Sequence, residues 1–304
     1  MLPPYLSPTR FLEVYLRRSL TAAGLTQRTV AIGETTVHLW GPPPESRSDK
    51  EKPALLLLHG FGPSAVWQWR RQVQAFSSSF RLYLPDLVFF GLSSSSSHQR
   101  SEIFQAECMA KVMEKEGVEK FHVVGTSYGG IVAYHMARLY PDKVDKVVIA
   151  SSGINMRRSD NSDLLKRASC RRIEELMLPS SAADLRRLLA LASSSQSLHM
   201  LPDFIWNDFI DKLYRENREK KVELLENLTL GKDEKSNVAS LSQEVLVIWG
   251  DQDQIFPVKM AYELKEILGP KTRLEIIKDT SHIPQLERSQ EFNDAVLEFL
   301  NSME

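Results

Sequence analysis

The sequence predicts an α/β protein with a mostly parallel sheet of the eight-stranded type, helices on both faces, and an inserted helical lid. Three observations lead to this prediction. Ala54–Leu58 is a continuous apolar run, which is typical of a strand buried on both faces. From there to Ala150, strand-like and helix-like segments alternate, as in β-α-β units. The alternation stops near Met156 and resumes after Leu241, which indicates an insertion.

The composition is that of a globular protein. The chain has 304 residues, of which 42% are hydrophobic and 25% charged, and its formal net charge is −1. This balance gives no reason to expect a nucleic-acid partner, and the short arginine pairs are typical of solvated helix faces. No apolar run approaches the roughly 18 residues that a membrane span needs.

Cysteine usage and the N-terminus suggest a compartment. Cys108 and Cys170 are the only cysteines and form no C-x-x-C motif, so we expect free thiols in a reducing environment. No basic segment followed by an apolar core opens the sequence, so no secretory signal is expected. The expected location is cytoplasmic.

Residues 1–26 are expected to carry a helix that precedes the main domain. Within residues 8–24, apolar side chains fall roughly on one side of a helix: Phe11, Leu12, Tyr15, Leu16 and Leu20. The simpler interpretation is that this side docks on the body of the protein. The alternative is a weak contact with a membrane surface, which would make the protein peripheral to a membrane.

Residues 27–155 and 242–304 are assigned to the core domain, and residues 156–241 to the lid. Two strands with alternating polarity, Arg28–Ile32 and Thr35–Trp40, are expected at an antiparallel edge. The other core strands are expected at Ala54–Leu58, Arg81–Pro85, Phe121–Gly125, Lys146–Ala150, Val245–Trp249 and Arg273–Lys278. The core helices are expected at Ala65–Phe76, Ser101–Glu116, Gly129–Leu139, Val258–Leu268 and Glu291–Ser302, and the lid helices near 163–177, 182–194 and 202–228.

The pattern with most chemical meaning is Gly125-Thr126-Ser127-Tyr128-Gly129. It joins an apolar strand end to a long apolar helix, which is the setting of a G-x-S-x-G nucleophile elbow. On such a turn the serine hydroxyl is held clear of the sheet, and the glycines leave room for the neighbouring strand and helix. Ser127 is therefore the candidate nucleophile.

A serine at its ordinary pKa is a weak nucleophile and needs a base that is itself oriented by an acid. His282 lies in the loop after the last predicted strand, at the sheet edge where the elbow opens, and is the candidate base. Two carboxylates follow the preceding strand. Asp253 is the preferred acid, while Asp251 directly follows Gly250 and could simply cap the turn. The chain order Ser, Asp, His is the one expected for an elbow hydrolase.

Negative charge that develops during acyl transfer also needs donors. His59-Gly60-Phe61-Gly62 follows a buried strand, so the backbone N–H of Phe61 is one candidate. The N–H of Tyr128, directly after the nucleophile and at a helix N-terminus, is the other.

Together these motifs resemble the α/β-hydrolase superfamily over nearly the whole chain from about residue 27. The matching residues are His59-Gly60-Phe61-Gly62, Pro85-Asp86-Leu87 with Gly91 and Ser93, Gly125-Thr126-Ser127-Tyr128-Gly129-Gly130, Gly250 with Asp253 and Pro257, and His282 with Pro284 and Glu287. The chain looks like lid-bearing esterases, monoacylglycerol-lipase-like enzymes and carbon–carbon bond hydrolases, and Phe89-Phe90-Gly91 resembles plant members. The resemblance implies a Ser-His-Asp mechanism with an acyl-enzyme and without cofactor or metal.

Two departures from the family pattern could reshape the pocket entrance. Ser281 stands where a glycine usually precedes the catalytic histidine, and Val88-Phe89 replaces a smaller residue in the Asp86 loop. Ser127 itself argues against epoxide hydrolases and dehalogenases, whose elbow carries an aspartate.

The leading prediction is a serine hydrolase that cleaves carboxylic esters of apolar or aromatic small molecules or monoacyl lipids. Candidate substrate contacts are Phe61, Trp206 and Phe209. One alternative is hydrolysis of a carbon–carbon bond in a ring-cleaved diketone, whose acidic group would need an arginine. The lid offers four: Arg171, Arg172, Arg186 and Arg187. Another alternative is a ligand-binding receptor of the same fold with residual hydrolysis.

Overall fold

The computed structural model describes residues 6–44 and 51–302 and is centred on one sheet. Its nine strands run in the order β1-β2-β4-β3-β6-β7-β8-β9, with β5 paired to β2 at one edge. The pairs from β4 to β9 are parallel, and β1 and β2 are antiparallel to their neighbours. The strands are β1 Thr26–Ile32, β2 Thr35–Gly41, β3 Ala54–Leu58, β4 Arg81–Pro85, β5 Ser94–Ser95, β6 Phe121–Thr126, β7 Val144–Ala150, β8 Glu244–Gly250 and β9 Thr272–Ile277. The predicted α/β fold is confirmed, and among the strands of the described residues only the two-residue β5 was not predicted.

Helices cover both faces of this sheet, and β3 shows why its sequence is apolar throughout. Leu56 and Leu58 point into the cluster under α4, α5 and α12, whereas Leu55 and Leu57 point into the cluster under α1, α2, α3 and α14. Because successive strand residues face opposite sides, a strand covered on both sides needs an apolar residue at each position. The covering helices are α1 Pro8–Ala22, α2 Ala65–Gln68, α3 Val73–Phe76, α4 Glu102–Lys115, α5 Tyr128–Leu139, α12 Lys259–Leu268 and α14 Ser289–Asn301.

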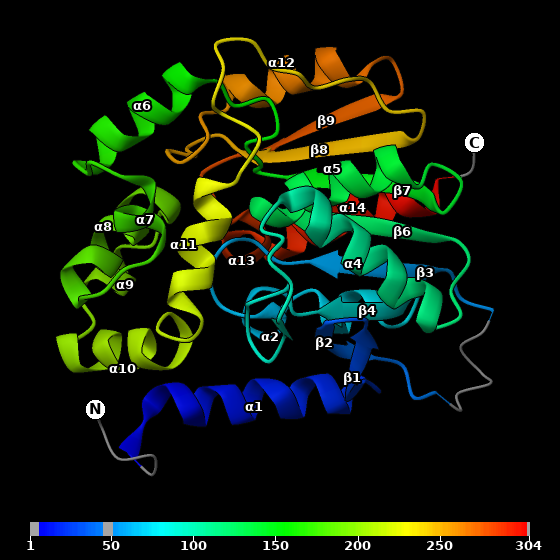
Figure 1. The fold of residues 1–304 in the computed structure, drawn as a ribbon, viewed down its shortest axis with the longest axis horizontal. Helices are drawn as coiled ribbons and strands as arrows, with labels where there is room; N and C mark the ends of the chain where they lie inside the picture. The colour runs from blue at the N-terminus through cyan, green and yellow to red at the C-terminus, as the bar shows by residue number, and fades with distance from the viewer. Residues whose placement is uncertain (1–5, 45–50, 303–304) are drawn as a thin grey trace.

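The chain leaves the sheet after β7 and forms a helical layer before it returns at β8, and Figure 1 shows this layer stacked to one side of the sheet. Its helices are α6 Arg158–Ala168, α7 Ile173–Met177, α8 Ala182–Ala192, α9 Gln196–His199, α10 Asp203–Leu213 and α11 Arg218–Glu226. We call the segment from α6 to α11 the lid. The short helix α13, Pro284–Glu287, follows β9 in the core.

Three helices predicted as continuous are each divided in two. The predicted helix at 163–177 ends at Ser169, whose φ is 52°, and the one at 202–228 is broken near Asn217, whose φ is also 52°. A residue in the left-handed region cannot continue a right-handed helix, and Asn is among the few residues that tolerate it. The helix predicted over Ala65–Phe76 is interrupted between Gln68 and Val73.

The N-terminal helix α1 packs on both the lid and the core, below α10 in Figure 1. The Ser7 hydroxyl donates to Asp208 of α10 at 2.7 Å, and the N–H of Thr9 donates to the same carboxylate at 3.1 Å. Leu16 and Leu20 are buried against the core. One side of α1 is therefore docked on the body of the protein. No helix in the described ranges has the length and apolarity needed to cross a bilayer.

Candidate active site

Ser127 occupies the sharp turn between β6 and α5. Its φ is 53° and its ψ is −119°, a conformation that costs a non-glycine residue about 1–3 kcal/mol. Glycine is required on either side of it. A Cβ on Gly125 would lie 2.2 Å from the carbonyl oxygen of Gly129, and one on Gly129 would lie 2.2 Å from that of Leu58. The sequence pattern therefore follows from backbone atoms that leave no space for a side chain.

A continuous hydrogen-bond chain links Ser127 to two residues far away in sequence. The Ser127 Oγ lies 3.0 Å from His282 Nε2, and His282 Nδ1 lies 2.9 Å from Asp253 Oδ2. The other carboxylate oxygen, Asp253 Oδ1, accepts the N–H groups of Ile255 at 2.8 Å and Phe256 at 2.9 Å. An ionised carboxylate can only accept, so His282 Nδ1 carries a proton and Nε2 is left to accept the Ser127 hydroxyl.

The competing carboxylate, Asp251, is exposed and takes no part in the hydrogen bonds that link Ser127, His282 and Asp253. Its Oδ1 accepts a long hydrogen bond, 3.4 Å, from the N–H of Thr280. The structure thus brings Asp253 to the imidazole and leaves Asp251 at the turn, the position that the capping interpretation gave it.

The loop that carries His282 is tied to the lid by Glu287 and Ser281. Glu287 Oε2 accepts the N–H of Ser281 at 2.7 Å, while its Oε1 accepts the Ser193 hydroxyl at 2.7 Å and the Ser194 N–H at 2.6 Å. The Ser281 hydroxyl also donates to the carbonyl of Leu191 in α8 at 3.0 Å. A glycine, the residue usual at this position in the family, has no hydroxyl and could not form this last hydrogen bond. Ser281 therefore adds a contact between the lid and the loop that carries His282.

The two candidate oxyanion donors belong to segments that adjoin Ser127. Within the part of the chain described, neither the Phe61 nor the Tyr128 N–H makes a hydrogen bond. Their loops are close, because a Cβ on Gly60 would approach the Ser127 Cβ to 3.0 Å. The Gly60 N–H donates to Gln68 Oε1 at 2.8 Å, which fixes the loop that carries Phe61. Unbonded N–H groups beside a nucleophile are the kind of donor that stabilises a developing negative charge in acyl transfer.

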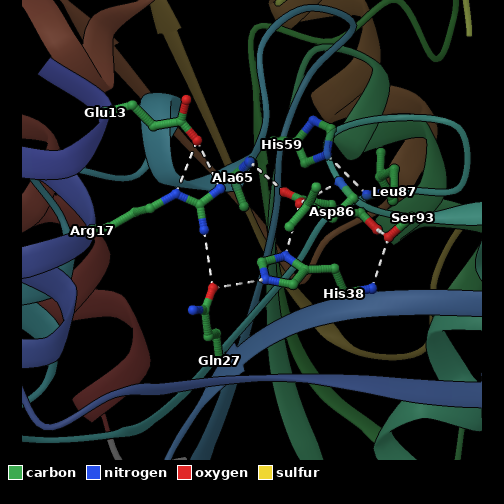
Figure 2. Close-up of polar contacts among 10 residues, drawn as sticks. Glu13, Arg17, Gln27, His38, His59, Ala65, Asp86, Leu87 and Ser93 are labelled. Atoms are coloured by element: carbon green, nitrogen blue, oxygen red, sulfur yellow. Dashed lines mark hydrogen bonds and ion pairs between the residues drawn. The ribbon is translucent and has the colours of Figure 1, made fainter. Parts of the chain in front are cut away.

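The carboxylate of Asp86 is buried and contacts Ala65, a few residues after Phe61 (Figure 2). Asp86 Oδ1 accepts the Ala65 N–H at 3.0 Å, and Oδ2 accepts from the Leu92 N–H at 3.2 Å and from His38 Nδ1 at 2.9 Å. Burial alone would raise the pKa of Asp86, but the hydrogen bond and charge of His38 outweigh it and lower that pKa overall. A side chain on Gly91 would collide with this carboxylate, since its Cβ would lie 2.2 Å from Oδ2.

Figure 2 shows that the Asp86 network continues outward to α1. His38 Nε2 lies 3.4 Å from Gln27 Oε1, and Gln27 Oε1 also accepts from Arg17 Nη1 at 3.0 Å. Arg17 in turn is paired with Glu13. The sequence identified Asp86 only through the family pattern, and it gave no sign that His38 in β2 is its partner.

His59 is buried beside the same loop and is neutral. Burial lowers its pKa, its Nδ1 donates to the Gly60 carbonyl at 2.8 Å, and its Nε2 accepts the Leu87 N–H at 2.9 Å. One donor and one acceptor nitrogen are what a neutral imidazole provides. His59 thus joins the Phe61 loop to the Asp86 loop.

Ser127 and His282 open into a cavity of about 370 Å³ that lies between the core, the lid and α1. Phe61, Trp206 and Phe209, the three candidate substrate contacts, all line it. Most of the other lining residues are apolar: Pro8, Leu12, Pro63, Trp67, Met177, Leu185, Leu188, Leu189, Ala192, Leu198, Leu201, Ile205, Ile255, Ile283 and Leu286. A cavity of this size and polarity suits an apolar small molecule.

One cationic side chain, Arg70, is found among the described residues that line the cavity. Burial, together with the neighbouring Arg71, lowers the pKa of Arg70 to about 10, so it remains charged at neutral pH. The four lid arginines do not line the cavity, and three of them pair with carboxylates: Arg172 with Glu174 and Glu226, Arg186 with Asp203, and Arg187 with Asp184. The lid arginines, which the carbon–carbon hydrolase alternative offered as partners of an acidic substrate, therefore do not lie in the cavity. Arg70 was missed because its position depends on how α1 and the lid pack.

The sequence profile of the α/β-hydrolase fold matches residues 53–289. This chain belongs to the α/β-hydrolase family. As such, it is similar to a carboxylesterase of Bacillus subtilis, with 26% identity over 271 residues that cover 88% of this chain and 84% of the relative. It is also similar to a 2-hydroxy-6-oxononadienedioate/2-hydroxy-6-oxononatrienedioate hydrolase of Burkholderia vietnamiensis, with 28% identity over 255 residues, 81% of this chain and 86% of that one.

Among solved structures, this α/β-hydrolase is similar to a meta-cleavage product hydrolase of Pseudomonas fluorescens. The TM-score is 0.72 at 22% identity, and the match covers 90% of this chain and 97% of that chain. At this identity the likeness concerns the fold. These comparisons assign the chain to the α/β-hydrolase family. They do not assign it to the plant-type, monoacylglycerol-lipase-like members that its sequence resembles.

Proposed function

We propose that this α/β-hydrolase cleaves carboxylic esters of apolar or aromatic small molecules or monoacyl lipids. The observation that carries the proposal is the hydrogen-bond chain from Ser127 through His282 to Asp253, which ends at an apolar cavity. A base already hydrogen-bonded to a hydroxyl, with an acid holding its tautomer, is the arrangement that activates serine. The similarity to a carboxylesterase supports the same reaction class.

In the proposed mechanism, His282 Nε2 takes the proton of Ser127 as Oγ attacks the ester carbonyl. The carbonyl oxygen becomes negatively charged and is stabilised by the N–H groups of Phe61 and Tyr128. His282 then donates the proton to the departing alcohol, which leaves an acyl group on Ser127. A water molecule, deprotonated by His282, attacks this acyl-enzyme, and the acid leaves as the proton returns to Ser127.

The test is hydrolysis of a panel of aryl and monoacyl esters, combined with labelling by a fluorophosphonate. Wild-type protein should be labelled and active, whereas Ser127→Ala should lose labelling and about 10⁴-fold or more in kcat. Ser96→Ala, in an exposed loop, is the matched control and should behave as wild-type. If wild-type and Ser127→Ala turn over esters equally slowly while a ligand raises the melting temperature, the ligand-binding receptor would be the better account.

A second candidate, hydrolysis of a carbon–carbon bond in a ring-cleaved diketone, is favoured by Arg70 and by the name of the Burkholderia relative. The carboxylate of such a substrate could pair with Arg70 while the ketone faces Ser127. In that reaction water adds across the carbon–carbon bond next to the ketone, which yields a carboxylic acid and a dienoate.

Comparing a 2-hydroxy-6-oxo-dienoate with a phenyl ester distinguishes the two candidates. If the second is right, the dienoate is the better substrate, and Arg70→Gln lowers kcat/KM for it about tenfold or more while leaving the neutral ester unchanged. If the ester is turned over and the dienoate is not, the second candidate is excluded.

A further inference from the structure

The helix α1 exposes an apolar patch to solvent. Phe11, Leu12 and Tyr15 are 64%, 47% and 67% exposed, whereas Leu16 and Leu20, further along the helix, are buried. Residues spaced three and four apart are neighbours on a helix surface, so these three side chains form one continuous patch. We call Phe11, Leu12 and Tyr15 the outer patch.

The outer patch adjoins the cavity that contains Ser127. Leu12 belongs to the patch and also lines the cavity, as do Pro8 and Thr9 in the preceding turn of α1. The contacts of Ser7 and Thr9 with Asp208 hold this part of α1 against the lid. Because Leu12 is half-exposed and also lines the cavity, whatever covers the outer patch contacts a residue of the cavity wall.

Charges beside the patch indicate the nature of the occupant. Arg10 and Arg18 are exposed on α1, and neither is paired with a carboxylate within the described ranges. Arg17 is already paired with Glu13, which is the only acidic residue of the helix. An exposed aromatic patch flanked by unpaired arginines matches an anionic lipid surface, where the rings enter the interface and the cations meet the head groups.

The size of the outer patch argues against a second copy of this chain as the occupant. A large apolar side chain has an area of about 150–250 Å², so the exposed fractions correspond to a total solvent-exposed area of about 350 Å² for the three side chains. A stable protein interface buries about 800 Å² on each partner. A helix lying in a membrane interface needs only its apolar side to be embedded.

We propose that α1 docks the protein on anionic membrane surfaces through Phe11, Leu12 and Tyr15, with the mouth of the cavity against the lipid. Resting on the proposed ester hydrolysis, we further infer that the substrates include monoacyl esters that pass from the surface into the cavity past Leu12. Docking itself does not depend on the reaction, so the two parts can be tested separately.

Docking is tested by flotation of the full-length protein with phosphatidylcholine vesicles, with and without phosphatidylserine. We expect wild-type to float with phosphatidylserine vesicles, and Phe11→Ser/Tyr15→Ser to partition about tenfold less or lower still. Arg10→Gln/Arg18→Gln should lose the preference for phosphatidylserine, about fivefold for each charge. The matched control, Leu139→Ser/Tyr262→Ser, removes exposed apolar residues of α5 and α12 and should float as wild-type does.

Three results would overturn docking: wild-type that floats with neither vesicle, Phe11→Ser/Tyr15→Ser that floats as wild-type does, or a dimer in solution that this variant converts to a monomer.

Delivery of the substrate from the membrane to the cavity is tested by hydrolysis. Phe11→Ser/Tyr15→Ser should hydrolyse a vesicle-borne monoacyl ester about tenfold more slowly and a soluble short-chain ester at the wild-type rate. Equal loss on both esters would contradict delivery, whereas flotation without any esterase activity would contradict the proposed function and leave docking standing.

Discussion

Replacing Asp253 by asparagine tests the proposed mechanism with little change in shape. Asp253 Oδ1 accepts two backbone N–H groups, from Ile255 and Phe256, and Oδ2 faces His282 Nδ1. In Asp253→Asn the amide oxygen should keep the two backbone donors, because turning it would place an NH₂ group against both of them. The NH₂ group then faces His282 and donates to Nδ1, so the imidazole proton moves to Nε2.

An imidazole protonated at Nε2 cannot accept the proton of Ser127, so the variant loses its base although all the atoms stay in place. In serine proteases that use a Ser-His-Asp triad, the same exchange lowers kcat about 10⁴-fold, equivalent to about 5.5 kcal/mol of barrier. We expect a similar loss here. The KM for a neutral ester should change little, because Asp253 does not line the cavity.

The assay is hydrolysis of a soluble aryl ester at neutral pH, with a thermal melt to verify folding. Asp251→Asn is the control, since Asp251 is exposed and does not reach the imidazole, and it should keep nearly full activity. The reasoning is refuted if Asp253→Asn stays within about tenfold of wild-type, or if Asp251→Asn proves the more damaging of the two.

Three further predictions concern stability and the lid. Lys221 is 2% exposed, and burial lowers its pKa from 10.5 to about 8. Because the folded state releases the proton at lower pH than the unfolded state, the free energy of unfolding rises with pH between about 8 and 10.5. Lys221→Met should therefore be more stable than wild-type to denaturant at pH 7, by about 2–3 kcal/mol, and should lose most of this advantage by pH 10. A stability difference that does not change with pH would contradict this prediction. Gly129→Ala should lower stability by about 2 kcal/mol or more in a thermal melt, or abolish soluble expression, because its Cβ meets the Leu58 carbonyl. In Glu287→Gln the new NH₂ group faces the N–H of either Ser281 or Ser194, whichever way the amide turns, so one of these hydrogen bonds is lost. We expect kcat to fall about tenfold with KM unchanged, because the loop that carries His282 is then held less firmly. A kcat equal to that of wild-type would show that Glu287 does not position His282.

The parts of the structure that the sequence predicts are those controlled by local constraints. The buried strand at Ala54–Leu58 is recognisable because both of its faces need apolar residues. The elbow at Ser127 is recognisable because backbone atoms exclude any side chain at Gly125 and Gly129. His282 and Asp253 follow from strand order, since loops after parallel strands meet at one edge of the sheet.

The parts that the sequence did not predict depend on contacts between distant segments. The break in the lid at Asn217 has no proline or glycine to mark it, and Asn217 donates to the Phe89 carbonyl of the core at 3.3 Å. The pairing of His38 with Asp86 joins β2 to the loop after β4, and the two residues are 48 positions apart in the chain. Arg70 lines a cavity that also includes residues of α1 and of the lid, which are distant from it in sequence.

The reacting groups and much of the cavity wall come from different parts of the fold, and this bears on substrate specificity. The groups proposed to carry out the reaction belong to the core: the elbow, the loops after β8 and β9, and the loop that carries Phe61. Half of the residues that line the cavity, in contrast, belong to the lid and α1. The lid is joined to the core by contacts such as those of Glu287 with Ser193 and of Asn217 with Phe89. Changes in the lid or α1 can therefore alter which substrate fits and leave the reacting groups in place. Such changes would account for relatives at 26% and 28% identity that carry the names of an ester hydrolase and of a dienedioate hydrolase.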